Sequence, residues 1–474
     1  MGMGSKQNEF SEDYLILKPK EASLVDVFLF ILPLGSRRIR SLIDCPDAKE
    51  ESYSSFKARC TIFVSILVQK FLLALAAPLL TLRAFLSVIQ PLFFNYMIGK
   101  GEFYTRSDSG PEVRCRDWQI EDPDDKGFKY YGALTMMASQ LAYEDYTASP
   151  SVVHSVVNGC WQMTLLGCFN FWNDFQNKAT TGAFMFQNTA KDPNVTVVAF
   201  RGTSVFEASD WMVDFNISWY KIEGIGRIHS GFMQALGLQK ATGWPKELPE
   251  AEHEFAYYTL RRRLRDIVKS NDKAKFIITG HSLGGALATL FVTLLALHQD
   301  STILQRLQAV YTFGQPRVGD KDFAEFMVNT VTRYGLKYYR YVYSFDLVPR
   351  VPFDSIIFKY KHFGGCLYFD CFYNGKFRKE QPNTNYFSLI WVIPKYSSAH
   401  WELISSLIII PVFKGREYFE GFVTTLERVV GLFFPGLSAH ICPNYVNVTR
   451  WGKIKVLPDR NETLKLVRYI EADT

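Results

Sequence analysis

The pattern of apolar and polar positions divides the chain into regions of different character. Residues 1–23 are polar and charged, and residues 24–98 are rich in apolar side chains. The following stretch, 99–125, is dense in charge, glycine and proline, which is typical of a linker. The rest of the chain mixes short apolar runs with amphipathic stretches. We therefore predict an N-terminal region over residues 1–125 and a larger globular domain over residues 126–474.

The larger region alternates patterns typical of strands and helices. Short β-branched or apolar runs predict buried strands, and longer amphipathic or apolar stretches predict helices. The predicted strands are 195–200, 276–279, 310–313 and 338–345. The predicted helices are 128–146, 261–269 and 283–298. Strands that alternate with helices predict an α/β fold with a mostly parallel sheet covered on both faces.

The apolar N-terminal region holds two stretches, at about 24–34 and 61–98. Charges and prolines interrupt both, and the purest piece, 71–82, is too short to cross about 30 Å of hydrocarbon as a helix. We expect these helical stretches to associate with a lipid or membrane surface. Packing against the globular domain and a true membrane span are the alternatives. A further apolar run at 403–413 is either a core helix or another element that contacts lipid.

Composition removes several classes of function. The chain has 474 residues, of which 48% are hydrophobic, enough for a large core. The net charge of +6 is mild and no Lys/Arg block stands out, so we expect no nucleic-acid partner. Eight cysteines without a C-x-x-C pair give neither a disulfide framework nor a zinc pattern. The polar start is not a secretory signal, so we expect reduced thiols and a domain that faces the cytosol.

The strongest chemical signal is the segment Gly280-His281-Ser282-Leu283-Gly284, between a predicted strand and a predicted helix. In that context Gly-x-Ser-x-Gly forms a nucleophile elbow, a sharp turn that presents the serine at the edge of the sheet. The glycines are required because a Cβ would clash where strand and helix approach closely. The helix start directs free N–H groups toward developing negative charge. We predict that Ser282 is a nucleophile; the alternative is an N-cap serine in an unrelated sheet.

A serine nucleophile needs an imidazole to take its proton and a carboxylate to orient that imidazole. Behind an elbow of this kind, the acid and then the histidine follow the serine along the chain. Asp346 directly follows the strand 338–345, so we expect it at the same sheet edge and predict that it is the acid. The remaining histidines are His362, His400 and His440. We favour His440 because it lies in a loop, where catalytic side chains are usually presented, and the other two stay open.

Five motifs in fixed order resemble the class 3, or fungal-type, triacylglycerol lipases. They are Val-Val-Ala-Phe-Arg201-Gly202-Thr203, Ile-His229-Ser-Gly231-Phe232, Gly280-His-Ser282-Leu-Gly284-Gly, Tyr-Thr-Phe-Gly314-Gln-Pro316-Arg-Val-Gly319 and Asp346-Leu-Val-Pro. The long N-terminal extension and the ending His440-x-x-x-x-Tyr445-Val-Asn resemble the plant oil-body lipases. The resemblance covers roughly residues 130–455 and implies an α/β-hydrolase fold.

The resemblance also implies roles for individual residues. The N–H groups of Thr203 and Leu283 would bind the oxyanion, and His440 would be the base. Residues 204–213 would form a lid, whose apolar side carries Val205, Phe206, Trp211 and Met212. We expect His229 and His281 to shape the pocket rather than to act as the base. The insertion around 366–413 has no counterpart in the family pattern.

The function implied by the resemblance is hydrolysis of acylglycerol esters through an acyl-enzyme on Ser282. We expect triacylglycerol, and also diacylglycerol, as substrates at the surface of a lipid droplet, to which the N-terminal segment would hold the enzyme. A phospholipase A1 or a galactolipase would use the same chemistry. A non-catalytic lipase-like scaffold is an alternative of another class, which the complete Ser–Asp–His set argues against. We expect no metal and no cofactor, and the sequence makes no prediction of oligomeric state.

Overall fold

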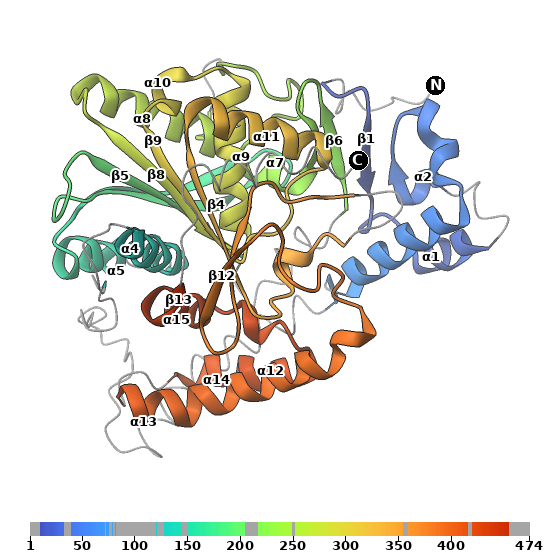
Figure 1. Ribbon diagram of the computed structural model, residues 1–474. Coiled ribbons are helices and arrows are strands. Elements are labelled where there is room, and N and C mark those ends of the chain that lie inside the picture. The colour runs from blue at the N-terminus through green and yellow to red at the C-terminus, as the bar shows by residue number, and fades with distance from the viewer. Residues whose placement is uncertain are drawn as a thin grey trace.

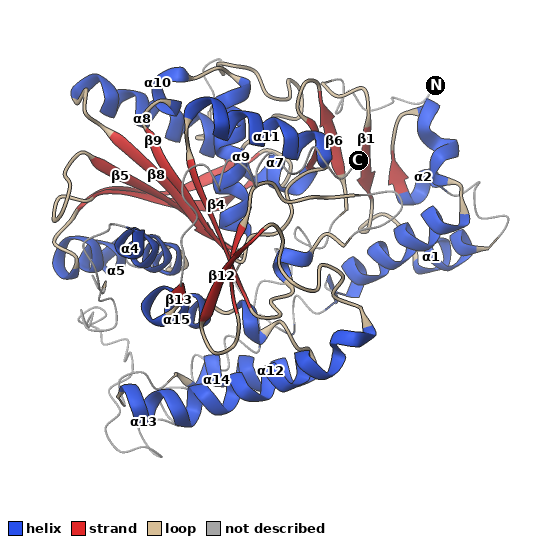
Figure 2. Cartoon of the chain, viewed as in Figure 1, coloured by secondary structure: helices blue, strands red, loops and turns tan. Residues whose placement is uncertain are grey.

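The computed structural model describes residues 10–32, 39–71, 73–74, 78, 81, 120, 128–144, 150–203, 217–248, 252–353, 359–415 and 420–454. Its main body is a sheet of nine described strands with helices on both faces (Figures 1 and 2). In spatial order the strands are β13 (Lys453–Ile454), β12 (Asn374–Arg378), β11 (Cys366–Phe369), β10 (Lys337–Tyr343), β9 (Leu307–Phe313), β8 (Lys275–His281), β5 (Val195–Phe200), β4 (Lys178–Gln187) and β3 (Thr164–Asn173).

The sheet is mixed. Among the described strands, β5, β8, β9, β10 and β11 form a parallel block. Strands β3 and β4 continue it antiparallel on one side, and β12 pairs antiparallel with β11 on the other. The predicted α/β alternation therefore holds for the centre, whereas the antiparallel margins were not predicted.

The central strands are buried on both sides, because helices cover each face. Besides the helical residues 56–71, the described α-helices are α1 (Leu24–Ile31), α2 (Ile39–Leu42), α4 (Phe128–Leu141), α5 (Pro150–His154), α7 (Ser230–Leu236), α8 (Ala256–Ser270), α9 (Leu283–Leu297), α10 (Ser301–Leu304), α11 (Lys321–Tyr334), α12 (Val392–Ile404), α13 (Ile410–Lys414), α14 (Phe422–Phe433) and α15 (Cys442–Trp451). Helices α7 to α11 share a core with one face of the sheet, and α4, α5 and α15 share a core with the other.

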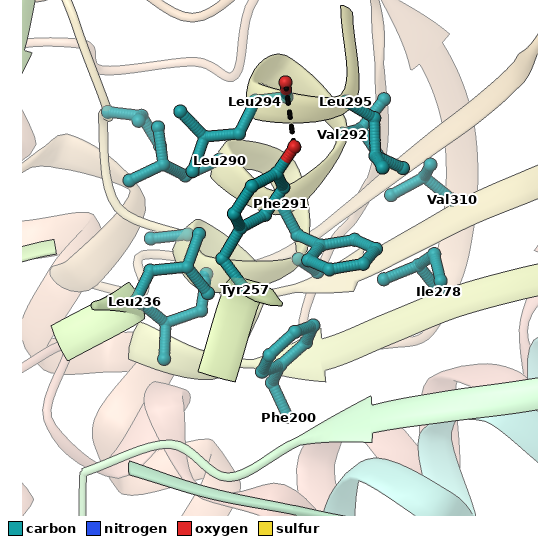
Figure 3. Close-up of a cluster of buried hydrophobic side chains, with 14 of the residues drawn as sticks. Phe200, Leu236, Tyr257, Ile278, Leu290, Phe291, Val292, Leu294, Leu295 and Val310 are labelled. Carbon is teal, nitrogen blue, oxygen red and sulfur yellow. Dashed lines mark hydrogen bonds between the residues drawn. The ribbon is translucent and has the colours of Figure 1, made fainter. Parts of the chain in front are cut away.

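Strand β5 shows why the central strands read as unbroken apolar runs. Its successive side chains point to opposite faces, so Val198 and Phe200 enter one core while Val197 enters the other. Figure 3 shows the first of these cores, in which Phe200 packs near Phe291 of α9 and Tyr257 of α8. The buried Tyr257 hydroxyl donates a hydrogen bond to the carbonyl oxygen of Leu294, at 3.2 Å.

The N-terminal region packs against the larger region. Strand β1 (Tyr14–Leu17) lies between β2 (Ile43–Asp44) and β6 (Trp219–Ile222), and β6 pairs with β7 (Gly226–His229). Helix α1 and the helical residues 56–71 bury the apolar side chains Val27, Phe30, Ile62 and Ile66. They expose Leu24, Val25, Phe28, Val64, Val68 and Phe71. These helices therefore bury one apolar side on protein and leave another apolar side accessible.

The N-terminal stretches at 24–34 and 61–98 lie only partly within the described residues. Within the part of the chain that the structure describes, no helix combines the length and the apolar character needed to cross a membrane. The expected boundary near residue 125 lies outside the described residues and stays a prediction.

The cysteines depart from one expectation. Cys160, at the end of the π-helical segment Ser155–Cys160, is disulfide-bonded, which contradicts the expectation that the thiols are reduced. The free cysteines of the described residues are Cys45, Cys60, Cys168, Cys366, Cys371 and Cys442. Sequence spacing argues against a dense disulfide framework, but it does not exclude a single bridge.

The insertion around 366–413 extends the sheet and adds a helical layer. Its β11–β12 hairpin lies beside β10, and α12 then continues through the π-helical turn Ser405–Ile409 into α13. Helix α14 packs against α12. Together α12, α13 and α14 form the lower edge of the molecule in Figure 1. The apolar run 403–413 is thus a helical segment at the margin of the fold and not a core helix.

Candidate active site

A strained turn carries Ser282 from β8 into α9. Ser282 has φ +57° and ψ −131°, a backbone conformation that non-glycine residues rarely adopt. A Cβ on Gly280 would lie 2.2 Å from the backbone carbonyl carbon of Gly284. A Cβ on Gly284 would lie 2.3 Å from the carbonyl oxygen of Phe200. Both glycines are therefore required for the strand and helix to meet, as the motif predicts.

Three buried side chains from distant parts of the sequence form a hydrogen-bonded chain. Nε2 of His440 lies 2.7 Å from Oγ of Ser282. Nδ1 of His440 lies 2.8 Å from Oδ2 of Asp346. The carboxylate accepts from Nδ1–H, which leaves Nε2 as the acceptor of the serine proton; this tautomer is assigned from the partners. The structure thus brings together all three residues that the sequence singled out as nucleophile, base and acid.

The other two histidines considered as the base lie elsewhere. His400 is exposed on α12, where its Nδ1 lies 2.8 Å from the carbonyl oxygen of Tyr396. His362 is buried, and its Nε2 lies 2.8 Å from the carbonyl oxygen of Pro349. Burial holds the pKa of His362 well below its ordinary value, so this ring is neutral. His362 follows an isolated bridge at Lys361 and lies outside the named strands.

The carboxylate of Asp346 is held by more than the histidine. Its Oδ2 also accepts a hydrogen bond from the Tyr445 hydroxyl, and its Oδ1 accepts from the backbone N–H of Val348, at 2.8 Å. Gly314, with φ +60°, lies directly against the pair, and a Cβ there would lie 2.8 Å from Cε1 of His440. These contacts fix the carboxylate's orientation, and with it the tautomer and plane of the imidazole.

His281 supports His440 from behind. Its ring stacks on the His440 ring, with 4.6 Å between centroids. Its Nε2 lies 2.9 Å from the backbone carbonyl oxygen of His440, and its Nδ1 lies 2.8 Å from the Tyr143 hydroxyl. Burial, reinforced by the nearby His440, holds the pKa of His281 well below its ordinary value. The ring is therefore neutral; Nε2–H donates to the carbonyl, and Nδ1 accepts from the tyrosine.

The segment predicted to supply the oxyanion donors lies beside the elbow. Thr203 is buried just beyond the end of β5. A Cβ on the preceding Gly202 would lie 2.5 Å from the carbonyl oxygen of His281, so the segment and the elbow touch. Leu283 is the first residue of α9, so its N–H has no acceptor within the helix. A pocket opens here, lined by Gly202, Leu283 and polar side chains that include Arg201.

The predicted lid lies outside the described residues. This holds for Val205, Phe206, Trp211 and Met212 alike. Among the residues that are described, no group of three or more His, Cys, Asp or Glu side chains could hold a metal ion.

A buried polar network holds the 3₁₀ turn Ser438–His440. The hydroxyls of Ser438 and Ser398 donate to the two carboxylate oxygens of Glu402, at 3.0 and 3.1 Å. The side-chain amide of Asn444 donates to the carbonyl oxygen of Ser438, at 2.7 Å, and itself accepts from Arg428. Burial raises the pKa of Glu402 to about 7, although Arg428 and both serine hydroxyls act in the opposite direction.

Sequence reasoning missed several residues that shape this site. Gly314 and Tyr445 stood inside the quoted motifs, which was a usable signal, but no contact was assigned to them. Tyr143 and Glu402 carry no motif at all. Both act through contacts with residues far away in the sequence, which periodicity and spacing do not report.

Comparisons with known proteins show which sequences this chain is similar to. The family model "Lipase (class 3)" matches residues 197–356. Triacylglycerol lipase OBL1 of Arabidopsis thaliana is 33% identical over 511 residues, covering 95% of this chain and 97% of that protein. The proteins of the same name from Nicotiana tabacum and Ricinus communis are 37% and 39% identical. Those two matches cover 68% and 69% of this chain, and 66% and 65% of the relatives.

Proposed function

We propose that this chain, which belongs to the class 3 lipase family, hydrolyses acylglycerol esters with Ser282 as the nucleophile. Membership of the family makes it a lipase, and the relatives named above are triacylglycerol lipases. The observation that carries the proposal is the continuous hydrogen-bonded chain from Ser282 through His440 to Asp346. A nucleophile, its base and the orienting acid are in contact before substrate arrives.

In the proposed reaction, Oγ of Ser282 attacks the ester carbonyl carbon while Nε2 of His440 takes the hydroxyl proton. Asp346 keeps the imidazole in the required tautomer and stabilises the imidazolium. The N–H groups of Leu283 and Thr203 receive the oxyanion, and one such donor is typically worth about 3 kcal/mol in the barrier. The tetrahedral intermediate expels the alcohol, which His440 protonates. Water, activated by the same histidine, then releases the fatty acid from the acyl-enzyme.

The proposed substrates are triacylglycerol and diacylglycerol at the surface of a lipid droplet, with the catalytic domain toward the cytosol. The substrate class is supported by the named relatives. Attachment by the N-terminal region is supported by the apolar side chains that it exposes, such as Phe28 and Val64. The lid over residues 204–213 and the domain boundary near residue 125 are proposed on the sequence pattern alone.

Fatty-acid release from emulsified triolein and from phosphatidylcholine vesicles tests the proposal, with wild type and Ser282→Ala side by side. We expect triolein hydrolysis by the wild type and a loss of at least about a thousandfold in the variant. Release confined to phosphatidylcholine would replace the proposal with a phospholipase. No serine-dependent release from either lipid would contradict it, and labelling by a fluorophosphonate would then separate another ester substrate from a non-catalytic scaffold.

A further inference from the structure

The insertion and helix α14, which packs against it, expose an unusually apolar surface. We call it the insertion face; it consists of Leu389, Ile390, Ile393, Ile404, Ile408, Val412, Phe413, Val429, Val430, Phe433 and Phe434. Several of these side chains are almost free of protein contact: Ile393 is 78% exposed and Phe413 is 80% exposed. Most of these side chains lie on or beside the two helices α12 and α14, which pack against each other, and a concentration of exposed apolar side chains of this kind marks an interaction site.

Helix 392–414, which carries five residues of this face, is amphipathic in the inverted sense. Residues 392–414 are helical throughout, a length of roughly 35 Å at about 1.5 Å per residue. Ile393, Ile404, Ile408 and Val412 recur at helical spacing along its outer side, where Ser397 and His400 are also exposed between the first two. The inner, buried side carries the polar residues Lys395, Ser398, Glu402, Ser405 and Ser406. A surface helix that contacts only protein and water would expose its polar side. The exposed apolar side of this helix therefore suits an apolar medium.

The charge distribution favours a lipid surface over a protein partner. Between residues 387 and 413 the structure exposes no Asp, Glu, Lys or Arg side chain, because Lys395 and Glu402, the charged residues of that stretch, are both buried. The next residue, Lys414, is exposed at the end of the stripe. Protein interfaces surround their apolar centre with a polar rim. An apolar stripe that exposes none of these four residue types and has a cation at its end instead suits acyl chains bordered by headgroups.

The insertion face is connected rigidly to the site. Ser398 and Glu402, on the inner side of α12, hold the turn that carries His440 through the hydrogen bond from Ser438. Helices α12 and α14 both pack on that turn. The distance between the insertion face and the reactive groups is thereby fixed by the fold and not by a flexible linker.

We propose that the insertion face is a lipid-contacting surface, with which the enzyme rests on its substrate phase. The proposal rests on the proposed function only in taking a lipid surface as the occupant. It adds a second docking surface, which lies C-terminal to Asp346 in the sequence, to the N-terminal attachment already proposed. Contact through this face sets the height and tilt of the Ser282–His440 site above the lipid.

The test compares how tightly the wild type, a triple variant and a control variant bind phospholipid-coated triolein droplets. Binding is measured by flotation of the full-length protein. The variant combines Ile393→Asp, Ile408→Asp and Val412→Asp, all on the outer side of the helix. The control for an added exposed charge is Leu166→Asp, at an exposed apolar position on the far edge strand β3; it is compared with the single variant Ile408→Asp as well as with the triple variant. We expect droplet affinity to fall by at least about tenfold in the triple variant, since charged side chains are excluded from the acyl region, and to stay at the wild-type level in the control.

Hydrolysis of a soluble short-chain ester checks that the site is intact, and we expect it to stay within about twofold of wild type because no changed side chain touches the triad. If the triple aspartate variant does not fold, the corresponding serine variant replaces it with the same expectation. Wild-type flotation of the triple variant would overturn the proposal. So would loss of binding only in Val64→Asp/Val68→Asp, which would assign docking to the N-terminal helices alone. A wild-type dimer that the triple variant converts to a monomer would instead make this face an interface between copies.

Droplet binding and fatty-acid release are measured separately, so the docking surface and the lipase activity can be refuted independently. Ser282→Ala retains the insertion face, so we expect it to float with droplets as the wild type does. A wild type that binds droplets through this face but releases no fatty acid would refute the lipase proposal alone. A wild type that hydrolyses triolein while the triple variant binds and hydrolyses equally well would refute the docking surface alone.

Discussion

Replacing Glu402 by glutamine tests how the buried network behind His440 responds to pH. Glu402 is 4% exposed and accepts hydrogen bonds from Ser398 and Ser438. Burial raises its pKa to about 7, against an ordinary value of 4.5. Glutamine has nearly the same shape and can still accept a hydrogen bond, but it does not titrate. The variant therefore removes the proton equilibrium with little change in packing.

The sign of the effect follows from the direction of the pKa shift. Below pH 4.5 the carboxyl of Glu402 is protonated in both the folded and the unfolded chain, so its contribution to stability is complete. As the pH rises toward 7, the unfolded chain releases the proton while the folded chain retains it. The free energy of unfolding therefore falls over this window and levels off above pH 7. The total loss is roughly 3 kcal/mol, at about 1.4 kcal/mol per pKa unit.

Glu402→Gln lacks this loss, so its stability relative to wild type should rise between pH 4.5 and pH 8 by that amount. With an unfolding entropy of about 2 cal/mol/K per residue, the 474-residue chain gives a difference in melting temperature of roughly 3 °C. Thermal unfolding at the two pH values and constant ionic strength measures it. The control is Glu325→Gln, at a half-exposed position on α11.

The quantity of interest is how the difference in melting temperature between Glu402→Gln and wild type changes from one pH to the other. Any effect of the substitution that does not depend on pH cancels in this comparison. If the melting temperatures of Glu402→Gln and wild type differ equally at both pH values, Glu402 does not retain its proton in the folded state. The buried carboxylate would then be ionised throughout, held by Arg428 and the two serine hydroxyls, and the reasoning from burial would be wrong.

Other substitutions probe the remaining contacts of the site. Tyr445→Phe removes a donor to Asp346; we expect hydrolysis of a soluble ester to slow about tenfold and thermal unfolding to show a loss of roughly 1–3 kcal/mol. Gly284→Ala places a Cβ 2.3 Å from a backbone oxygen, so we expect destabilisation of about 3 kcal/mol or more, or no folded protein, in the same unfolding assay. His440→Ala should lower kcat by about a thousandfold or more, whereas His400→Ala should leave kcat unchanged; equal effects would contradict the assignment of the base.

The centre of the fold was predictable because its physics is local. Strands 195–200 and 276–279 are buried on both faces and therefore read as unbroken apolar runs. The elbow motif is equally local, since strand, turn and helix are contiguous. The position of Asp346 followed from the rule that parallel strands end at one edge. The observed bounds of β5 coincide with the predicted strand, and β8 extends the predicted one by a few residues.

The margins of the sheet were not predicted, because their strands lack a clean pattern. Strands β3 and β4 form a long antiparallel hairpin, of which β3 is the edge strand and is only partly buried. Irregularities in register occur between Leu165 and Gly167 and between Phe171 and Trp172. Each shift moves the following side chains to the other face, so the period-two alternation that marks a half-buried strand is interrupted. The N-terminal helices were ambiguous for another reason, since each buries one apolar side and exposes another.

The insertion could not be interpreted from its sequence, because the usual rule for amphipathic helices gives the wrong answer there. Apolar positions on an amphipathic helix are normally assigned to the core and polar positions to water. In α12 the polar residues Ser398 and Glu402 face the protein, while Ile393 and Ile404 face outward. The buried polar side is explained by its hydrogen bonds to the turn that carries His440. The exposed apolar side is explained by the lipid contact proposed above. Substitutions on the two sides should therefore separate: those on the polar side alter the site, and those on the apolar side alter droplet binding.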